Sequence, residues 1–321
     1  MKKLLLILAG LAVVGAAAAY WMLWARPGPA AGPHTVIVEE GSSLARVAGQ
    51  LDRIGAIPGT STTYRAMARL FGSGDPVQAG EFVIPRGTGG ARVLDILQHG
   101  QPVQRLVTVP EGMPSILVHE KLMAIPHLTG SIPVPAEGSV LPDSYSYQRG
   151  EARAAVLKRM QDAMTKTLDS LWAKKGPNSV VDSKREAIIL ASVVEKETGK
   201  AAERPMVAGV YSNRLRIGMK LDADPTVIYP ITKGKPLGRR IRRSELDADN
   251  GYNTYAMAGL PAGPIANPGR ESIAAVLNPA QTRALYFVAD GTGGHIFANT
   301  LAEHNANVAK WYAIRRQRGE M

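Results

Sequence analysis

The chain has 321 residues, of which 45% are hydrophobic and 20% are charged, and its formal net charge is +11. This length predicts about two domains, and the apolar content is enough for a sizeable core, which excludes a disordered chain. The sequence contains no Cys. That excludes disulfide bonds, Cys-ligated zinc, iron–sulfur clusters and a thiol nucleophile. The excess of Lys and Arg favours an anionic partner.

The first part of the chain is apolar. Residues 4–24 carry no charge, and Lys2 and Lys3 precede them. As a helix this segment would span about 31 Å, close to the thickness of a bilayer core. The two lysines predict a single-pass anchor in the cytoplasmic (inner) membrane, with the N-terminus inside and the body extracytoplasmic, which excludes nucleic acid as a partner. The alternative is a cleaved signal peptide with Ala17–Ala19 as its cleavage site.

The remaining sequence predicts a linker and two blocks. Residues 1–25 form the cytoplasmic stub and the transmembrane helix, and the Pro- and Gly-rich residues 26–33 predict a stiff linker. Residues 34–105 predict a small α+β subdomain, with strands at 34–38, 80–84 and 103–109 and helices at 42–51, 62–71 and 91–99. Residues 106–321 predict a larger mixed α+β domain. We expect one helix that opens after the turn at 109–113 and runs to residue 122. Further helices are expected at 151–174, 183–199, 205–217, 272–277 and 300–316, and a strand at 284–289. Residues 137–147 are expected to be irregular, and 222–260 to be loop and strand.

One of these helices carries the strongest chemical signal. Ser183 and Glu186 have the spacing of a capping box, and Gly199 is a plausible stop just beyond the helix. Residues 187–194 are apolar or small all the way round, which predicts a helix buried on every side. A buried helix that ends in charged residues is a candidate for an active-site element.

Glu195 and Glu197 fall in the last turn of this helix. At about 100° per residue the two side chains lie about 160° apart, so they cannot share one face as an acid/base pair. Burial and the negative end of the helix dipole both disfavour a charged carboxylate, which suits a general acid. Small Ala191 and Ser192 predict space for a substrate beside Glu195. The alternative is that both glutamates simply solvate the helix end beside neighbouring lysines.

Distinctive blocks follow one another along the chain at Val109–Gly112, Leu141–Asp143, Leu190–Gly199, Asn213–Tyr229, Tyr252–Tyr255, Gly259–Gly269, Tyr286–Phe297 and His304 with Asn305. In this order they resemble the membrane-anchored endolytic murein transglycosylases, the MltG-like or YceG-like family, and the likeness covers nearly the whole chain. The chain departs from the family where Ala262 replaces the usual second proline, at residues 139–141, which lack the usual aromatic residue, and in the unusually basic stretch 238–243. These departures bear on substrate preference.

The resemblance implies an activity and a location. It makes Glu195 the sole catalytic acid/base and residues 34–105 a LysM-like subdomain that would hold glycan strands. The substrate would be nascent peptidoglycan glycan strands near the membrane, whose elongation the cleavage would terminate, and peptidoglycan synthases are candidate partners. No cofactor and no metal are implied. His119 and Glu120 lack the second His of a zinc-protease helix.

The reaction implied by the resemblance needs only one carboxyl group. Glu195 would protonate the oxygen between N-acetylmuramic acid and N-acetylglucosamine, then accept the proton of the muramic acid C6 hydroxyl as that oxygen attacks C1, which gives a 1,6-anhydro end. A hydrolase would need a second carboxylate. Candidate substrate-binding residues are Asn213, Asp224, Tyr252, Asn253 and Tyr255, each of which has an alternative role in a turn or in the core.

Two other functions stay open on the sequence. One is a non-catalytic, membrane-anchored scaffold that binds peptidoglycan through residues 34–105 and recruits other enzymes. The other is a hydrolytic muramidase that uses Glu195 together with Glu197 or Asp224. A scaffold should keep its function when Glu195 is replaced by Gln. A muramidase would release products with reducing ends instead of anhydro ends.

Overall fold

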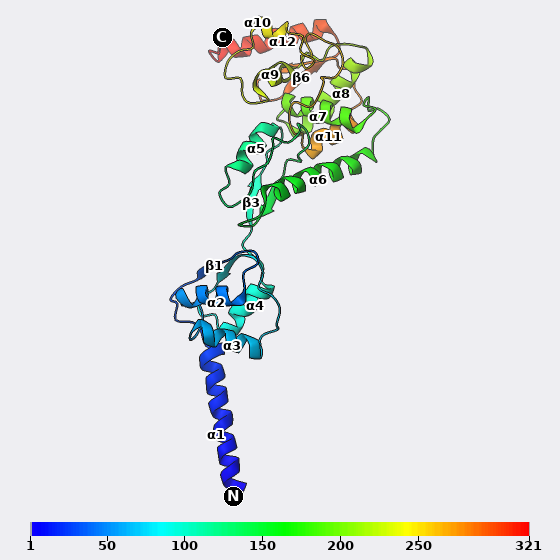
Figure 1. Ribbon diagram of the computed structural model, residues 1–321. Helices are drawn as coiled ribbons and strands as arrows, with labels where there is room; N and C mark the ends of the chain where they lie inside the picture. Colours follow the sequence, from blue (N-terminus) through cyan, green and yellow to red (C-terminus); the bar gives the residue numbers. More distant parts are fainter. Residues whose placement is uncertain (1, 321) are drawn as a thin grey trace. The chain divides into compact units, whose positions relative to one another are not determined.

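The computed structural model describes residues 2–320, and the chain folds as two compact units (Figure 1). The first unit comprises the chain up to Arg105 together with Ser146–Glu151. The second comprises Leu106–Tyr145 and the chain from Ala152 onward. Both units contain helices and short strands, so the fold is mixed α and β, as the sequence predicts.

The first unit begins with the apolar helix. Helix α1 (Lys2–Tyr20) continues into a short π-helical turn, η1 (Trp21–Ala25). Residues 2–25 have a mean hydropathy of 2.2 over their most apolar window, and by length and composition they could cross a membrane. None of the α1 side chains is buried.

The rest of the first unit is a small α+β core. Strand β1 (His34–Val38) pairs antiparallel with β2 (Gly80–Ile84), with His34 opposite Ile84. Along β1 the side chains of Val36 and Val38 are buried while those between them face solvent, which is the period of a half-buried strand. Helices α2 (Leu44–Arg53), α3 (Ser61–Phe71) and α4 (Gly90–His99) complete the core.

The Pro- and Gly-rich segment, which the sequence predicts to be a stiff linker, packs against the first unit along part of its length. Trp24 is only 2% exposed, and its ring lies 5.4 Å from that of Tyr64 in the core of the first unit. The N–H of Ala30 donates to the carbonyl of Gly55 at 3.0 Å. A Cβ on Gly28 would lie 2.5 Å from that same carbonyl oxygen. Residues 24–30 are therefore packed against this unit, because glycine permits a backbone approach that Pro and Gly content alone does not reveal.

The second unit is mostly helical and has two small sheets of two strands each. Strands β3 (Arg105–Thr108) and β4 (Ser144–Tyr147) pair with each other, and the boundary between the units falls within them. Strands β5 (Tyr286–Ala289) and β6 (His295–Ala298) form a hairpin. The helices are α5 (Ser115–Met123), α6 (Arg153–Trp172), α7 (Lys184–Glu197), η2 (Ala201–Glu203), α8 (Arg204–Arg216), α9 (Asp224–Thr232), α10 (Arg243–Leu246), α11 (Arg270–Leu277) and α12 (Leu301–Gln317).

Helix α7 lies at the centre of the second unit. All of residues 187–194 are buried, as predicted, and the helix packs against α8, α9 and α11. The hydroxyl of Ser183 accepts the N–H of Glu186 at 3.2 Å, which confirms the helix start. The carboxylate of Glu186 accepts the N–H of Asp182 instead of that of Ser183, so only half of the predicted capping box forms.

Several local predictions in this unit are wrong. Residues 222–260 contain helices α9 and α10 and no strand, and the short strands β4 and β6 were not predicted. The chain leaves α7 through Thr198 in an extended conformation, with φ −133°, and Gly199 has no left-handed backbone. The predicted glycine stop is therefore not formed.

Candidate functional site

The last turn of α7 directs three consecutive side chains to three different surroundings. Glu195 faces the interior between α7, α8 and the start of α11. Lys196 faces an apolar groove, and Glu197 faces a separate cavity beside the β5–β6 hairpin. The sequence prediction that the two glutamates act separately fits this arrangement.

The carboxylate of Glu195 is held by protein groups on both oxygens. Its side chain is 4% exposed, and Oε1 accepts a hydrogen bond from the Arg204 guanidinium at 3.0 Å. Oε2 accepts the backbone N–H of Gly269 at 2.8 Å. Arg204 also donates to Glu111 at 2.6 Å. This ion-pair network ties α7 to α8 and to the start of α11, so Glu195 has the surroundings of a buried structural carboxylate.

The two small residues that the sequence predicted to leave space beside Glu195 are packed by the protein itself. Ala191 and Ser192 are completely buried. The hydroxyl of Ser192 donates to the carbonyl of Ile189 at 2.7 Å and accepts the N–H of Ile265 at 3.0 Å. These small residues allow close packing of the chain near Ile265 and do not line a cavity.

Glu197 has the properties that the sequence analysis assigned to Glu195. Burial and, to a smaller extent, the negative charge of Asp224 raise the pKa of the Glu197 carboxyl to about 7, against the opposing effect of a hydrogen bond with Tyr211. Among the described residues, its buried Oε1 has no hydrogen-bond partner. A carboxyl that is protonated near neutral pH, with one oxygen uncommitted, can act as a general acid.

Glu197 lines an open cavity of about 290 Å³. Strand β6 contributes His295, and the last helix α12 contributes Trp311, with Arg318 just beyond its end. Between β5 and β6 the glycine-rich turn completes the wall. The cavity thus combines a titratable carboxyl group, an aromatic ring and cationic or polar groups, a mixture typical of ligand-binding pockets.

The turn over this cavity is held by Asp290. Its carboxylate accepts the N–H groups of Thr292 at 2.6 Å and Gly294 at 3.0 Å. The hydrogen bonds from Thr292 lower the pKa of Asp290 to about 2. On the next strand, His295 Nδ1 lies 2.8 Å from a carboxylate oxygen of Glu203. These contacts fix the turn and the His295 ring at the mouth of the cavity.

Two of the predicted binding residues belong to the surroundings of Glu197. The hydroxyl of Tyr255 donates to Asp224 Oδ1 at 2.7 Å. Burial and the carboxylate of Asp224 raise the pKa of this Tyr255 hydroxyl. Asp224 begins α9, where Pro225 occupies the first turn. The structure therefore brings Asp224 and Tyr255 into the electrostatic environment of Glu197.

The other predicted binding residues lie elsewhere in the fold. The amide of Asn213 donates to the carbonyls of Thr282 at 2.9 Å and Ala284 at 3.0 Å, which holds the chain before β5 against α8. Asn253 is completely buried, and its amide donates to backbone carbonyls at the end of α10. The ring of Tyr252 lies 5.1 Å from that of Tyr229. As folded, these side chains stabilise loops and do not face the Glu197 cavity.

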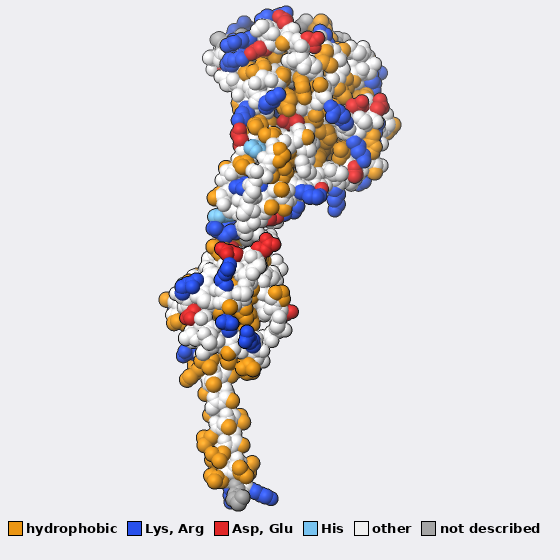
Figure 2. Space-filling model, in the orientation of Figure 1, with side chains coloured by type: hydrophobic (Ala, Val, Ile, Leu, Met, Phe, Trp, Pro, Cys, Tyr) orange, Lys and Arg blue, Asp and Glu red, His pale blue; other side chains and the backbone are white. Residues whose placement is uncertain are grey.

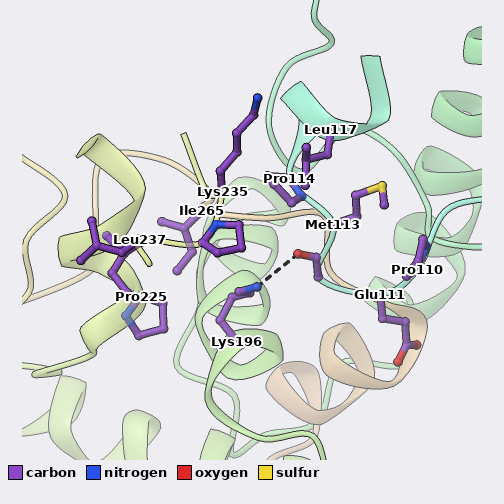
Figure 3. Close-up of a pocket in the computed structure, with 14 residues that line it drawn as sticks. Pro110, Glu111, Met113, Pro114, Leu117, Lys196, Pro225, Lys235, Leu237 and Ile265 are labelled. Atoms are coloured by element: carbon purple, nitrogen blue, oxygen red, sulfur yellow. Dashed lines mark hydrogen bonds between the residues drawn. The ribbon is translucent and has the colours of Figure 1, made fainter. Parts of the chain in front are cut away.

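A second concave surface lies on the Lys196 side of α7 (Figure 3). This groove has a volume of about 510 Å³ and is mostly apolar. The amine of Lys196 points across it to the carbonyl of Gly112 at 3.5 Å. Glu111 turns its carboxylate away from the labelled apolar side chains, which accords with its bond to Arg204.

Sequence reasoning missed His295, Trp311 and Arg318 as lining residues, because they come from elements far from α7 in the sequence. Within residues 2–320 no group of three or more His, Asp or Glu side chains is placed to hold a metal ion.

The chain belongs to the YceG-like family, whose sequence model matches residues 36–310. A protein of Bacillus subtilis named endolytic murein transglycosylase is 34% identical over 185 residues, which cover 57% of this chain and 50% of that protein. A protein of Streptococcus pneumoniae with the same name is 27% identical over 327 residues, covering 86% of this chain and 58% of the relative. The chain thus spans between half and three-fifths of the length of these relatives.

A solved structure supports the fold. The crystal structure of a yceG-like protein from Listeria monocytogenes is similar to this chain with a TM-score of 0.53 and 25% sequence identity. The likeness covers 86% of this chain and 98% of that chain.

Proposed function

We propose that this protein is an endolytic peptidoglycan lytic transglycosylase, which cleaves the bond between N-acetylmuramic acid and N-acetylglucosamine to leave 1,6-anhydro ends. Membership of the YceG-like family and the names of the curated relatives support this activity. The observation that carries it is the Glu197 carboxyl, whose pKa is raised to about 7 at the wall of an open cavity.

Glu197 is the better candidate for the acid/base than Glu195. A general acid must hold a proton and must reach the substrate. Both oxygens of Glu195 already accept hydrogen bonds, one from the Arg204 guanidinium and one from the Gly269 N–H. Glu197 lines the cavity, and its Oε1 is buried with no hydrogen-bond partner among the described residues. Glu195, which the family resemblance assigned to catalysis, then acts as a positioning residue that fixes the end of α7.

The proposed reaction is balanced with one carboxyl. The Glu197 carboxyl donates its proton to the glycosidic oxygen as the bond from that oxygen to C1 of muramic acid breaks. The resulting carboxylate accepts the proton of the C6 hydroxyl, and the C6 oxygen forms the new bond to C1. No water is consumed, and Glu197 ends protonated. Asp224 lies close enough to affect the pKa of Glu197, so its charge also favours the positive charge that develops on the sugar.

A hydrolytic muramidase is the second candidate, and Asp224 is the observation that favours it. Hydrolysis requires a second carboxylate as nucleophile or base. Asp224 interacts with Glu197 but already accepts the Tyr255 hydroxyl at 2.7 Å. This hydrogen bond occupies one oxygen of the carboxylate that hydrolysis would need, which favours the transglycosylase.

The location and the role of the first unit are further parts of the proposal. We propose that α1 anchors the protein in the inner membrane with its N-terminus inside, that residues 34–105 form a LysM-like module that binds glycan strands, and that peptidoglycan synthases are partners. The apolar α1 and the two lysines at its start support the anchor and its orientation. The strand and helix order of the first unit accords with a small glycan-binding module.

The product separates these functions. Full-length protein in detergent is incubated with purified peptidoglycan, and the released muropeptides are weighed by mass spectrometry. Products lighter by one water than reducing-end muropeptides, absent with Glu197→Gln, would support the transglycosylase. Reducing ends would show a muramidase. Retained binding without cleavage by the unaltered protein would show a scaffold. The full chain is needed because removal of residues 1–25 would delete buried Trp24.

A further inference from the structure

The first unit exposes apolar side chains next to the end of α1. On α3, Leu70 is 73% exposed and Phe71 is 55% exposed, and they form the last turn of that helix. The ring of Phe71 packs edge-on against Tyr20, the last residue of α1, with ring centroids 5.1 Å apart. Figure 2 shows hydrophobic side chains gathered where α1 enters the unit. Such a patch, left in water, is costly and usually marks a contact surface.

The length of α1 sets the level of this patch. The helix has 19 residues, which span about 28 Å, close to the roughly 30 Å of a hydrocarbon core. Beyond Tyr20 the chain enters the core of the first unit, because Trp24 is 2% exposed. The membrane span therefore ends near Tyr20, and Phe71 lies at the same level.

We propose that the end of α3 dips into the bilayer surface, with Leu70 and Phe71 in the interfacial region and Arg69 beside anionic headgroups. This inference rests on the proposed membrane anchoring by α1. Aromatic and apolar side chains favour the interface, and a neighbouring Arg is attracted by anionic lipid. The occupant of the patch is a lipid surface because the patch is continuous with the exposed apolar surface of α1 through the Tyr20–Phe71 contact.

The packing of η1 connects the Tyr20–Phe71 contact to the core of the first unit. Trp24 packs on Tyr64 of α3, and η1 also contacts α4. Helix α3 is thus held to the anchor at two points, Tyr64 and Phe71. The first unit would be fixed on the membrane surface and would hold glycan strands close to it.

The test uses the absence of Cys, which allows a single label on the full chain. Three single-cysteine variants carry an environment-sensitive fluorophore in vesicles of phosphatidylcholine and phosphatidylglycerol. Leu70→Cys probes the proposed contact and Val14→Cys probes the anchor. Ile37→Cys on β1 is the control, because Ile37 is also exposed and β1 lies at the opposite end of the unit from α1 (Figure 1). Each vesicle is prepared with and without lipid that carries a quencher at the upper acyl chain.

The proposal predicts that the quencher lipid removes most of the fluorescence at residues 70 and 14 and leaves residue 37 unchanged. Quenching at 14 but not at 70 would overturn the α3 contact and keep the anchor. No quenching at 14 would overturn both. Protection of residue 70 only in native membranes, and not in pure lipid, would assign the patch to a protein partner and also overturn the proposal.

Discussion

Glu197 at the end of α7 and Asp224 at the start of α9 are electrostatically linked. Burial raises the pKa of Glu197 to about 7, and the negative charge of Asp224 adds to the rise. The two residues are 27 positions apart in the sequence, and helices α7 and α9 pack together to bring them near each other. Burial and this link together keep the Glu197 carboxyl partly protonated near neutral pH.

The pH dependence of cleavage should follow from this link. Because the protonated form of Glu197 is the active one, the rate should fall as pH rises through about 7. In Asp224→Asn, the carboxylate of Glu197 loses a repelling neighbour, so its pKa and the alkaline limb of the profile should both move to lower pH. The measurement is the initial rate of anhydro-muropeptide release between pH 5 and pH 9. An alkaline limb that stays in place in Asp224→Asn would show that Asp224 does not act on the acid.

Stability should depend on pH through the same carboxyl. The pKa of Glu197 is raised on folding from 4.5 to about 7, so the folded state binds the proton more tightly than the unfolded state. Its contribution is therefore complete below pH 4.5 and is lost as pH rises through about 7. Glu197→Gln should be more stable than the unaltered protein at pH 8, by about 2–3 kcal/mol.

Thermal unfolding of both proteins at pH 5 and pH 8 measures this difference. Glu197→Asp is the matched control, because it keeps a titratable carboxyl at the site and should retain the loss of stability at high pH. If the unfolding temperatures of Glu197→Gln and the unaltered protein depend equally on pH, the pKa of Glu197 is not raised on folding.

The ion pair of Glu195 should matter for folding more than for proton transfer. Arg204→Ala leaves Glu195 buried without its cation and should cost about 3–5 kcal/mol of unfolding free energy. Adding Glu195→Gln to Arg204→Ala should recover part of this loss, because the uncompensated charge is then removed. Denaturant unfolding of the two single variants and the double variant gives the coupling. Additive effects would mean that the two side chains do not interact in solution.

The packing of the Pro- and Gly-rich segment can be tested with two glycines. Gly28→Ala places a Cβ 2.5 Å from the Gly55 carbonyl oxygen and 2.7 Å from the Ile57 nitrogen, which are backbone atoms that cannot move freely. We expect a loss of about 1–3 kcal/mol. Gly32→Ala is the control, since nothing lies within 4 Å of its Cβ. Calorimetry should show a lower unfolding temperature for Gly28→Ala alone. Equal unfolding temperatures for the two variants would contradict the packing of this segment.

The sequence predicted the buried helix α7 well, because its capping residue and its apolar content are local signals. The sequence assigned catalysis to Glu195, through the family resemblance and the small residues Ala191 and Ser192 beside it. Periodicity shows that the two side chains point in different directions, but it does not show what each one meets. Arg204 is the first residue of the next α-helix, α8, and Gly269 lies 74 residues from Glu195 in the sequence. The ion pair that occupies Glu195 therefore becomes visible only when the chain is folded.

Other parts of the site were hidden for similar reasons. Asp224 and Pro225 were interpreted as a turn, although Pro in the first turn is also a helix-start signal, and α9 begins there. Strands β4 and β6 have four residues each, too short for a clear alternating pattern. Trp311 and His295 reach the cavity of Glu197 from the C-terminal part of the chain through tertiary packing.

The central claim is that Glu197, and not Glu195, transfers the proton. The most direct measurement compares anhydro-muropeptide release by Glu195→Gln and Glu197→Gln, prepared as full-length proteins and shown by circular dichroism to be folded. We expect Glu197→Gln to abolish release. We expect Glu195→Gln to keep a measurable rate, with the alkaline limb of its pH profile unchanged. Release that is abolished by Glu195→Gln in a folded protein, and retained by Glu197→Gln, would contradict it.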